Sequence, residues 1–163
     1  MSQEGCCEPL RLTRARLQDL EQLKAWFTEQ RSLSDWAGPG LHYPISMGVF
    51  LQQIRWQELS SYSMLSNDGE LLAFGQFYIR LGRHHLGRLA VSPNHRNRGL
   101  GKQLIRQLIE QARIEQPASG LSLFVMEDNI PALACYLSLG FRHAVYSEAL
   151  SGGLENCSYM IRD

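Results

Sequence analysis

Apolar residues in the first third of the chain repeat with two different periods. Residues 10–13 alternate between apolar and polar side chains, which predicts a short strand, and residues 17–27 then carry apolar side chains at helical spacing. The glycines and prolines of residues 36–44 predict a loop, and helical spacing returns over residues 47–54. This part of the chain therefore predicts a strand and two helices.

The middle of the chain has the pattern of strands. Residues 62–65 and 71–81 are rich in apolar and aromatic side chains and flank Asn67-Asp68-Gly69, so they predict a hairpin. Residues 84–91 predict a third strand, which ends before Pro93. Three consecutive strands indicate that an antiparallel sheet begins here.

Apolar residues after Gly99 form one stripe at helical spacing, which predicts an amphipathic helix. The stripe consists of Leu100, Leu104, Ile105, Leu108, Ile109 and Ala112. A short apolar strand is predicted over residues 121–126. The segment Asp128-Asn129-Ile130-Pro131 then offers two capping side chains and a proline suited to a first helical turn, so another helix is predicted from Ile130 to Gly140.

The end of the chain predicts a closing hairpin, with strands in residues 141–150 and 154–161 around Ser151-Gly152-Gly153. The full order is β-α-α-β-β-β-α-β-α-β-β, which predicts a mixed α/β fold with about four helices. A length of 163 residues fits one domain over residues 1–163, in which we expect residues 1–8 to form a loose tail.

Composition limits the partners and the location. With 16 basic and 16 acidic residues, no overall field attracts nucleic acid or an anionic membrane, so we expect neither partner. The polar N-terminus and the absence of a long apolar run predict a cytoplasmic protein. The four cysteines lack C-x-x-C spacing, which favours free thiols over a metal site or disulfides; they are Cys6, Cys7, Cys135 and Cys157. A homodimer is left open.

Basic residues gather just before the amphipathic helix. The stretch after Leu81 carries no Asp or Glu but includes Arg83, Arg88, Arg96, Arg98 and Lys102, with His84, His85 and His95. Gly99 and Gly101 let a ligand approach the unpaired amides of the first helical turn, where the helix dipole adds about 0.3–1 kcal/mol per negative charge. The turn therefore predicts a phosphate site.

Two common phosphate motifs do not fit this turn. A P-loop requires Ser or Thr after Gly-Lys, whereas Gln103 follows Gly101-Lys102. A dinucleotide-binding fingerprint requires a third glycine where Leu104 stands. A plain surface turn is the other alternative, and the neighbouring arginines speak against it.

The stretch from Leu89 to Leu104 resembles the acetyl-CoA signature of the GNAT N-acetyltransferase superfamily, with a core of Q/R-x-x-G-x-G/A that Arg96, Gly99 and Gly101 match. The resemblance implies a central, mostly antiparallel sheet with a splayed parallel strand pair, in three layers. It also implies that the pyrophosphate of acetyl-CoA binds the amides of Arg96, Asn97, Arg98, Gly99, Leu100, Gly101 and Lys102, and that the pantetheine arm pairs with Leu89, Ala90 and Val91.

A second segment also resembles the family, because residues 129–141 match N-x-x-A-x-x-x-Y-x-x-x-G-F. Asn129, Ala132 and Tyr136 share one face of the last helix and would lie along the cofactor. The resemblance implies that Tyr136 protonates the departing thiolate of coenzyme A. A buried aromatic that only packs on the sheet is the alternative.

The general base is a separate question. An amine with a pKa near ~10 must lose a proton before it attacks a thioester, and His85, six residues before Val91, has a suitable ordinary pKa of about 6.5. A bulge at Gly87 would change which face the strand residues occupy. Some relatives carry a Glu near Phe124, and here Glu127 is closest. His85, another group and water all stay open.

The chain is therefore expected to be an acetyl-CoA-dependent N-acetyltransferase that acts on a primary amine in a ternary complex. Use of a longer acyl-CoA and a non-catalytic coenzyme A sensor are the alternatives. Trp36, His42 and Tyr43 could surround an apolar acceptor, or they could pack on the core. A small-molecule amine, a peptide N-terminus and a protein lysine all stay open as acceptors.

Overall fold

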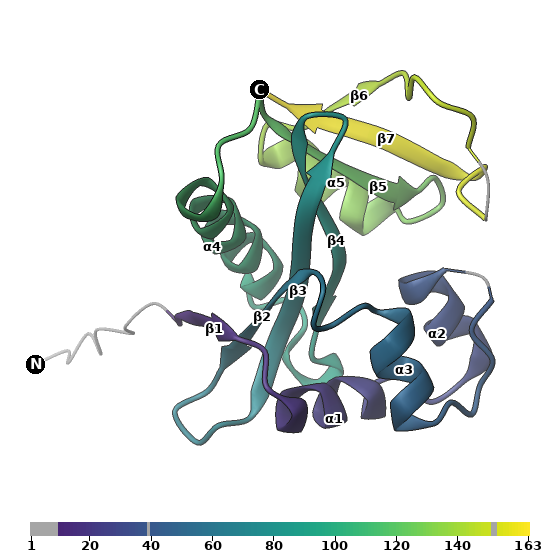
Figure 1. Cartoon of the computed structure of the whole chain (residues 1–163), viewed down its shortest axis with the longest axis vertical. Coiled ribbons are helices and arrows are strands. Elements are labelled where there is room, and N and C mark those ends of the chain that lie inside the picture. Colours follow the sequence, from purple (N-terminus) through teal and green to yellow (C-terminus); the bar gives the residue numbers. More distant parts are fainter. Residues whose placement is uncertain (1–9, 39, 151–152) are drawn as a thin grey trace, which may run out of the picture.

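The computed structural model describes residues 10–38, 40–150 and 153–163 of the chain. These residues form a seven-stranded sheet with helices on both faces (Figure 1). The order across the sheet is β1-β2-β3-β4-β5-β7-β6, and only β4 and β5 pair in parallel among the described residues. The predicted mostly antiparallel sheet with one parallel pair is confirmed. The strands are β1 (Leu12–Arg14), β2 (Ser60–Leu65), β3 (Leu71–Arg80), β4 (Arg83–Val91), β5 (Leu121–Met126), β6 (Arg142–Ala144) and β7 (Cys157–Arg162).

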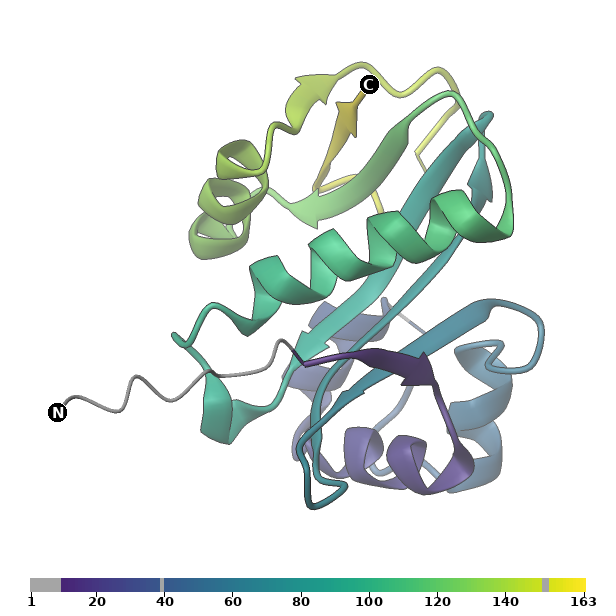
Figure 2. The same ribbon diagram turned by 90° about the vertical axis from the view of Figure 1, so that its left-hand side faces the viewer.

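The helices form two layers around the sheet. They are α1 (Leu17–Ala25), α2 (Gln30–Ala37), α3 (Met47–Gln53), α4 (Leu100–Glu115) and α5 (Ile130–Ser138). In Figure 2, α4 lies in front of the sheet and the fainter α2 and α3 lie behind it, while α5 packs on the same hydrophobic cluster as α4. Each layer has its own hydrophobic cluster, one under α4 and one among α1, α3 and β3. The three-layer expectation from the resemblance is therefore met.

The described residues form five helices where about four were predicted, and the additional one is α2. Its sequence has only two large apolar residues, Leu33 and Trp36, so the helical period is weak, and Trp36 was assigned to the loop at residues 36–44. In the structure Leu33 is fully buried, and Trp36 stacks on Phe27 with ring centroids 4.5 Å apart. Tertiary packing thus stabilises a helix that the local pattern does not indicate.

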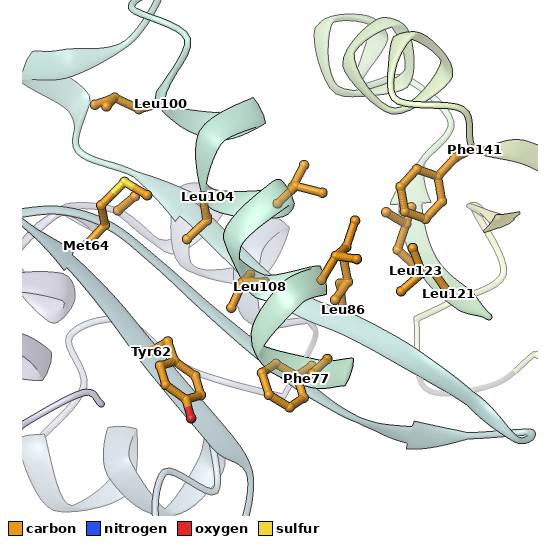
Figure 3. Packing of buried hydrophobic residues seen from close by; sticks show 14 of the residues in the cluster. Tyr62, Met64, Phe77, Leu86, Leu100, Leu104, Leu108, Leu121, Leu123 and Phe141 are labelled. Carbon is orange, nitrogen blue, oxygen red and sulfur yellow. The ribbon is translucent and has the colours of Figure 1, made fainter. Parts of the chain in front are cut away.

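The larger cluster packs the apolar stripe of α4 against the sheet (Figure 3). All six predicted stripe residues, from Leu100 to Ala112, are buried. They lie on the side chains of Phe77 and Leu86 from the sheet and beside Leu121 and Leu123 of β5. Full burial of each leucine contributes about 1.5–3 kcal/mol, so this interface fixes the start of α4 against β4.

The parallel pair separates at one end. Residues His84–Leu86 of β4 pair with Leu121–Leu123 of β5, and the pairing stops there, although β4 continues to Val91 and β5 to Met126. The unpaired ends of the two strands diverge toward the side where α4 and α5 begin. This opening matters because both segments that resemble the family lie directly after it.

Strand β4 is not regular but contains a bulge, the alternative that Gly87 allowed. Gln76 of β3 pairs with Gly87, whereas Phe74 pairs with Ala90, so two residues of β4 stand opposite the single residue Gly75. Arg88 carries the left-handed backbone conformation, with φ of 48°, and Gly87 does not. The extra residue therefore falls one position after the glycine that indicated it.

The bulge reverses the alternation of side chains along β4. Leu86 faces the α4 cluster, and beyond the bulge Leu89 and Val91 face it too, while Ala90 faces the α1–α3 cluster. Gly75 makes room for this arrangement, since a Cβ atom there would lie 3.0 Å from Leu89 Cδ2. The regular alternation, with His85 and Leu89 on one face, is thus not observed.

The closing hairpin is confirmed as an antiparallel pair of β6 and β7, but β6 is shorter than the predicted strand over residues 141–150. Residues 145–156 connect the two strands, and Ser151 of the predicted turn lies outside the described residues. The predicted tail at residues 1–8, with Cys6 and Cys7, also lies outside them. Cys135 and Cys157 are free thiols, as expected.

Candidate active site

The connection from β4 to α4 leaves the first turn of the helix without a side-chain cap. The chain passes through a short 3-10 turn at Pro93–His95, and the left-handed residues Asn97 (φ 63°) and Gly99 (φ 75°) then turn it into α4. Gly99 is the N-cap residue, and no side chain of the described residues caps the first amides of the helix. These amides, together with the helix dipole, form an anion-binding end.

The space in front of this helix end is open. A Cβ atom built on Gly99 would have no heavy atom within 4 Å, and one on Gly101 would meet only Val91 Cγ2 at 3.9 Å. Neither glycine is therefore required by packing against the rest of the protein. Their absence of side chains instead leaves the amides accessible, which is the condition for a phosphate to approach the main chain.

A cavity of about 860 Å³, here called the donor cavity, joins this helix end to the opening between β4 and β5. Arg98 and Lys102 do not line it, although they belong to the predicted turn. Lys102 instead lies close enough to the thiol of Cys135 for its charge to lower the pKa of that group, against the larger upward effect of burial. The predicted cofactor residues that line the cavity are Leu89, Ala90, Val91, Arg96, Asn97, Gly99, Leu100, Gly101, Asn129, Ala132 and Tyr136.

The five Arg and Lys side chains between Leu81 and Lys102 lie at different places in the structure, although their clustering in the sequence indicated one anion site at the turn. Arg83 forms an ion pair with Asp163 at 2.8 Å. Arg88 donates to the side chain of Gln76 at 3.2 Å and faces a different cavity. The bulge turns Arg88 away from the helix end, so Arg96 is the only one of the five cations of this stretch, all of them described, to line the donor cavity.

The start of α5 forms the opposite wall of the donor cavity. Asn129 caps the helix, with its side-chain oxygen accepting from the amide of Ala132 at 3.3 Å. Tyr136 lies two turns along α5 with its ring 6.1 Å from that of Phe141. Burial, with a smaller effect of Cys135, raises the pKa of the Tyr136 phenol to about 12. The phenol is therefore protonated at neutral pH and can donate its proton.

A second cavity of about 520 Å³, here called the acceptor cavity, adjoins the first. It extends along β3, β4 and β5 to the start of β7 and is bounded by the end of α2. Six residues line both cavities, and Tyr136 is one of them; the others are Asp35, Trp36, Leu89, Met126 and Asn129. The two spaces therefore meet at Tyr136, in the opening between the parallel strands.

His85 lies in the acceptor cavity and is 2% exposed. Its Nδ1 atom is 2.8 Å from the hydroxyl oxygen of Ser122, and its ring lies between those of Tyr78 and Phe124, with centroids 5.3 and 5.0 Å away. Burial, with a contribution from the Arg80 charge, lowers the pKa of His85 to about 3. The imidazole is therefore neutral at physiological pH. His84, by contrast, lies next to the carbonyl of Gln116 at 2.6 Å.

Of the three aromatic residues that could surround an acceptor, only Trp36 lines a cavity. Trp36 packs in the core and also lines both cavities. His42 and Tyr43 are exposed and line neither cavity. Glu127 is exposed as well and lines neither, and the position near Phe124 supplies an aromatic ring beside His85.

Sequence reasoning missed several residues of these walls. Asp35 comes from the missed helix α2, and Met126 ends β5 at the opening. Arg80 lines the acceptor cavity from the end of β3. A signal for Arg80 existed, since Gln76, Tyr78 and Arg80 are polar residues at every second position of an otherwise apolar strand, which indicates a face that is not core.

Two negative observations apply to the described residues. No group of three or more His, Cys, Asp or Glu side chains among them is placed to hold a metal ion. None of their helices is long and apolar enough to cross a membrane.

The sequence of the chain matches a family model and several known proteins. The model of the Acetyltransferase (GNAT) family matches residues 20–141. A ribosomal protein bS18-alanine N-acetyltransferase of Escherichia coli K12 is 34% identical over 80 residues, 49% of this chain and 53% of that protein, so the match spans about half of the relative. The corresponding protein of Salmonella typhimurium is 35% identical over 122 residues, 74% of each chain.

Solved structures have the same fold. The E. coli ribosomal-protein-S18-alanine N-acetyltransferase superposes with a TM-score of 0.62 and 24% identity over 92% of this chain and 90% of that one. A Vibrio cholerae spermidine N-acetyltransferase, solved with CoA and spermine, gives a TM-score of 0.71 and 16% identity over 94% and 95%. At these identities the likeness concerns the fold alone.

Proposed function

Because the chain belongs to the GNAT acetyltransferase family, we propose that it is an N-acetyltransferase that moves the acetyl group of acetyl-CoA to a primary amine by direct attack in a ternary complex. The amine nitrogen forms a bond to the acetyl carbon, the carbon–sulfur bond breaks, the nitrogen loses a proton and the sulfur gains one. The similar proteins have different acceptors in their names, ribosomal-protein alanine in one case and spermidine in another, so membership of the family does not define the acceptor.

One observation carries this proposal: the uncapped end of α4 opens into a cavity that continues to Tyr136. The space at Gly99 and Gly101 can take phosphate oxygens, because among the described residues a Cβ atom there would meet nothing closer than Val91 Cγ2 at 3.9 Å. The amides between Arg96 and Lys102 would hold the pyrophosphate of acetyl-CoA, with the Arg96 side chain at the cavity wall. Polar main-chain groups of residues 89–91 would pair with the pantetheine arm, since β4 has left β5 at this point.

Tyr136 is proposed as the acid that gives a proton to the leaving sulfur. It lies where the two cavities meet, and its raised pKa keeps the phenol protonated at any pH at which the enzyme would work. The alternative, that Tyr136 only packs on the sheet, does not explain its position. The residue packs against the core and also lines both cavities. The hydroxyl is the part of the residue that chemistry would use.

His85 is proposed to accept a hydrogen bond from the attacking amine, because its burial makes it too weak a base to take the proton of an ammonium group. A pKa of about 3 makes the imidazole neutral but weakly basic, so taking a proton from an ammonium group of pKa near ~10 would be uphill by about 9.5 kcal/mol. Loss of that first proton to bulk solvent at pH 7, before the amine attacks, is uphill by only about 4 kcal/mol and is the easier route. His85 can still accept a hydrogen bond from the attacking nitrogen, which becomes more acidic as its bond to carbon forms.

The test compares two glycines that occupy the same position of two helices. Gly101 is the second residue of α4 and Gly48 the second residue of α3, and a Cβ atom at Gly48 meets nothing within 4 Å. Gly101→Glu places a carboxylate in the anion site and should weaken acetyl-CoA binding in calorimetry at least tenfold, about 1.4 kcal/mol. Gly48→Glu should leave it unchanged.

Thiol release with a panel of amines then separates the remaining alternatives. Release that requires both acetyl-CoA and an amine supports transfer, whereas tight binding without release from any amine would favour the coenzyme A sensor. Faster release from longer acyl-CoA thioesters would favour the longer-chain acyltransferase. Equal affinity of the Gly101→Glu and wild-type proteins for acetyl-CoA would refute the site itself.

A further inference from the structure

The acceptor cavity carries an excess of positive charge. Its wall includes two arginines, Arg80 and Arg88, and one carboxylate, Asp35, among the described residues. Asp35 lies 3.8 Å from Arg31 on the same helix, so its charge already has a partner. His85 contributes no charge at neutral pH. An acceptor that enters this space therefore meets two guanidinium groups without an opposing carboxylate of their own.

Arg80 is held in place by rings and not by acids. Its guanidinium carbon lies 5.0 Å from the ring centre of Phe124, 5.7 Å from that of Tyr78 and 6.0 Å from that of Tyr146. Its guanidinium has no hydrogen bond and no ion pair to any of the described residues, although the side chain is half-buried. These cation–π contacts supply no acceptor oxygen, so the N–H groups of the guanidinium stay free to donate to a ligand.

Arg88 is oriented by a buried amide. Gln76 is fully buried and donates to the carbonyl of Ile54 and to the hydroxyl of Ser61, both at 2.9 Å, which fixes its oxygen toward Arg88. Arg88 also donates to the carbonyl of Gln53 at 3.3 Å. Its Nε atom is buried and has no partner among the described residues. An unsatisfied buried donor is unfavourable by about 1–3 kcal/mol, so this position favours an acceptor oxygen.

From this arrangement we propose that Arg80 and Arg88 bind a carboxylate carried by the amine acceptor, which makes the preferred acceptor an amino compound with a nearby carboxylate and not a polyamine. Acetylation of such an acceptor rests on the proposed function, whereas binding of its carboxylate by the two arginines does not. The planar fork of a guanidinium matches the two oxygens of a carboxylate, and such charge-assisted pairs are stronger than neutral hydrogen bonds.

The carboxylate can come from two sources: the free C-terminus of a small amino compound or an acidic side chain near the N-terminus of a peptide. The test uses two matched pairs of probes whose amines have the same pKa of about 8. The first pair is alanyl-alanine and its C-terminal amide. The second is a tetrapeptide amide with glutamate or glutamine in its second position.

Each probe is titrated by calorimetry into the protein saturated with coenzyme A, so that no turnover occurs. In at least one pair, we expect the probe with the carboxylate to bind at least tenfold more tightly than its neutral partner. Arg80→Gln and Arg88→Gln should each reduce this preference to within about threefold. Arg106→Gln should preserve it, because Arg106 is exposed on α4 and lines neither cavity. The pair that shows the preference identifies the source.

Several outcomes would overturn the proposal. They are equal affinity for the charged and neutral members of both pairs, binding of neither carboxylate probe, tighter binding of spermidine than of any carboxylate probe, and a preference that persists in both arginine variants. Because Arg88 contacts Gln76, its variant is checked for folding by circular dichroism, and Arg80→Gln decides the matter if that variant unfolds. If coenzyme A does not bind at all, the titration is repeated without it, and a preference that depends on the arginines then stands although the proposed function fails.

Discussion

A single methyl group at Gly75 should destabilise the protein, because the β4 bulge leaves no room opposite it. A Cβ atom at this position would lie 2.6 Å from Leu108 Cδ1 and 3.0 Å from Leu89 Cδ2. Leu108 is fully buried in the α4 cluster and cannot move into solvent. Overpacking of this kind costs about 1–3 kcal/mol. The reduced entropy of the unfolded chain offsets about 0.4–1 kcal/mol, so we expect Gly75→Ala to lower the free energy of unfolding by about 1–2 kcal/mol.

The matched control is Gly87→Ala, on the neighbouring strand of the same ladder. A Cβ atom there would meet only Tyr78 Cε1 at 3.7 Å, an ordinary contact, and the backbone of Gly87 does not have a positive φ. We therefore expect this variant to be as stable as the wild type or up to about 1 kcal/mol more stable.

Urea unfolding measures both variants. The 3 tryptophans of the chain provide a fluorescence signal from the α1–α3 half, and far-ultraviolet circular dichroism adds α4 and α5. Coincident transitions would justify a two-state free energy. If Gly75→Ala and Gly87→Ala have the same stability, Leu89 and Leu108 give way without cost, and the close approach at the bulge does not determine the packing of α4.

Three further predictions concern the proposed site. Tyr136→Phe should reduce turnover at least ~100-fold in a thiol-release assay while leaving calorimetric affinity for acetyl-CoA within twofold; unchanged turnover would exclude the acid role. His85→Ala should slow acetylation by a similar factor from pH 7 to pH 9, because the imidazole is neutral throughout this range; a loss that disappears at high pH would mean instead that His85 takes the first proton from the ammonium group. The pKa of His85 is about 3 in the folded chain and about 6.5 in the unfolded chain, so at pH 5 only the unfolded chain binds this proton. His85 should therefore contribute a loss of about 2 kcal/mol in the free energy of unfolding between pH 7 and 5, and His85→Gln should lose less than the wild type by about that amount in the same urea titrations.

The sequence indicated the parts of the fold whose local pattern and packing agree. The apolar stripe from Leu100 to Ala112 is strictly periodic and lies on the sheet as one face, and Asn129 caps α5 as its position before Pro131 predicts. Strand β5 begins and ends where its apolar run does, at Leu121 and Met126. In each case the residues nearby in sequence are sufficient to define the element.

The remaining parts depend on contacts between distant residues. Helix α2 exists because Trp36 stacks between Phe27 and Phe50, and no spacing within Gln30–Ala37 contains that information. The extra residue of the bulge sits at Arg88, where Gly75 on another strand provides the space. A glycine in β4 indicated an irregularity but not its position.

The candidate site divides in the same way. Glycines and the Asn129 cap belong to short continuous segments and could be found by eye. The acceptor wall is assembled from the ends of β3 and β5, the bulge and the connection before β7, so Arg80 and Phe124 meet only after folding. The low basicity of His85 is likewise invisible in the sequence, because burial causes it.

Six side chains form part of both cavity walls, with Trp36 and Met126 among them. Whatever occupies one space must shape the surface that the other occupant contacts. If the first ligand changes the dissociation constant of the second by some factor, thermodynamic linkage requires the second to change that of the first by the same factor. Each ligand would therefore be titrated alone and in the presence of the other, and the two coupling factors obtained in this way must agree. The size of this factor would report how strongly the six shared side chains couple the two cavities.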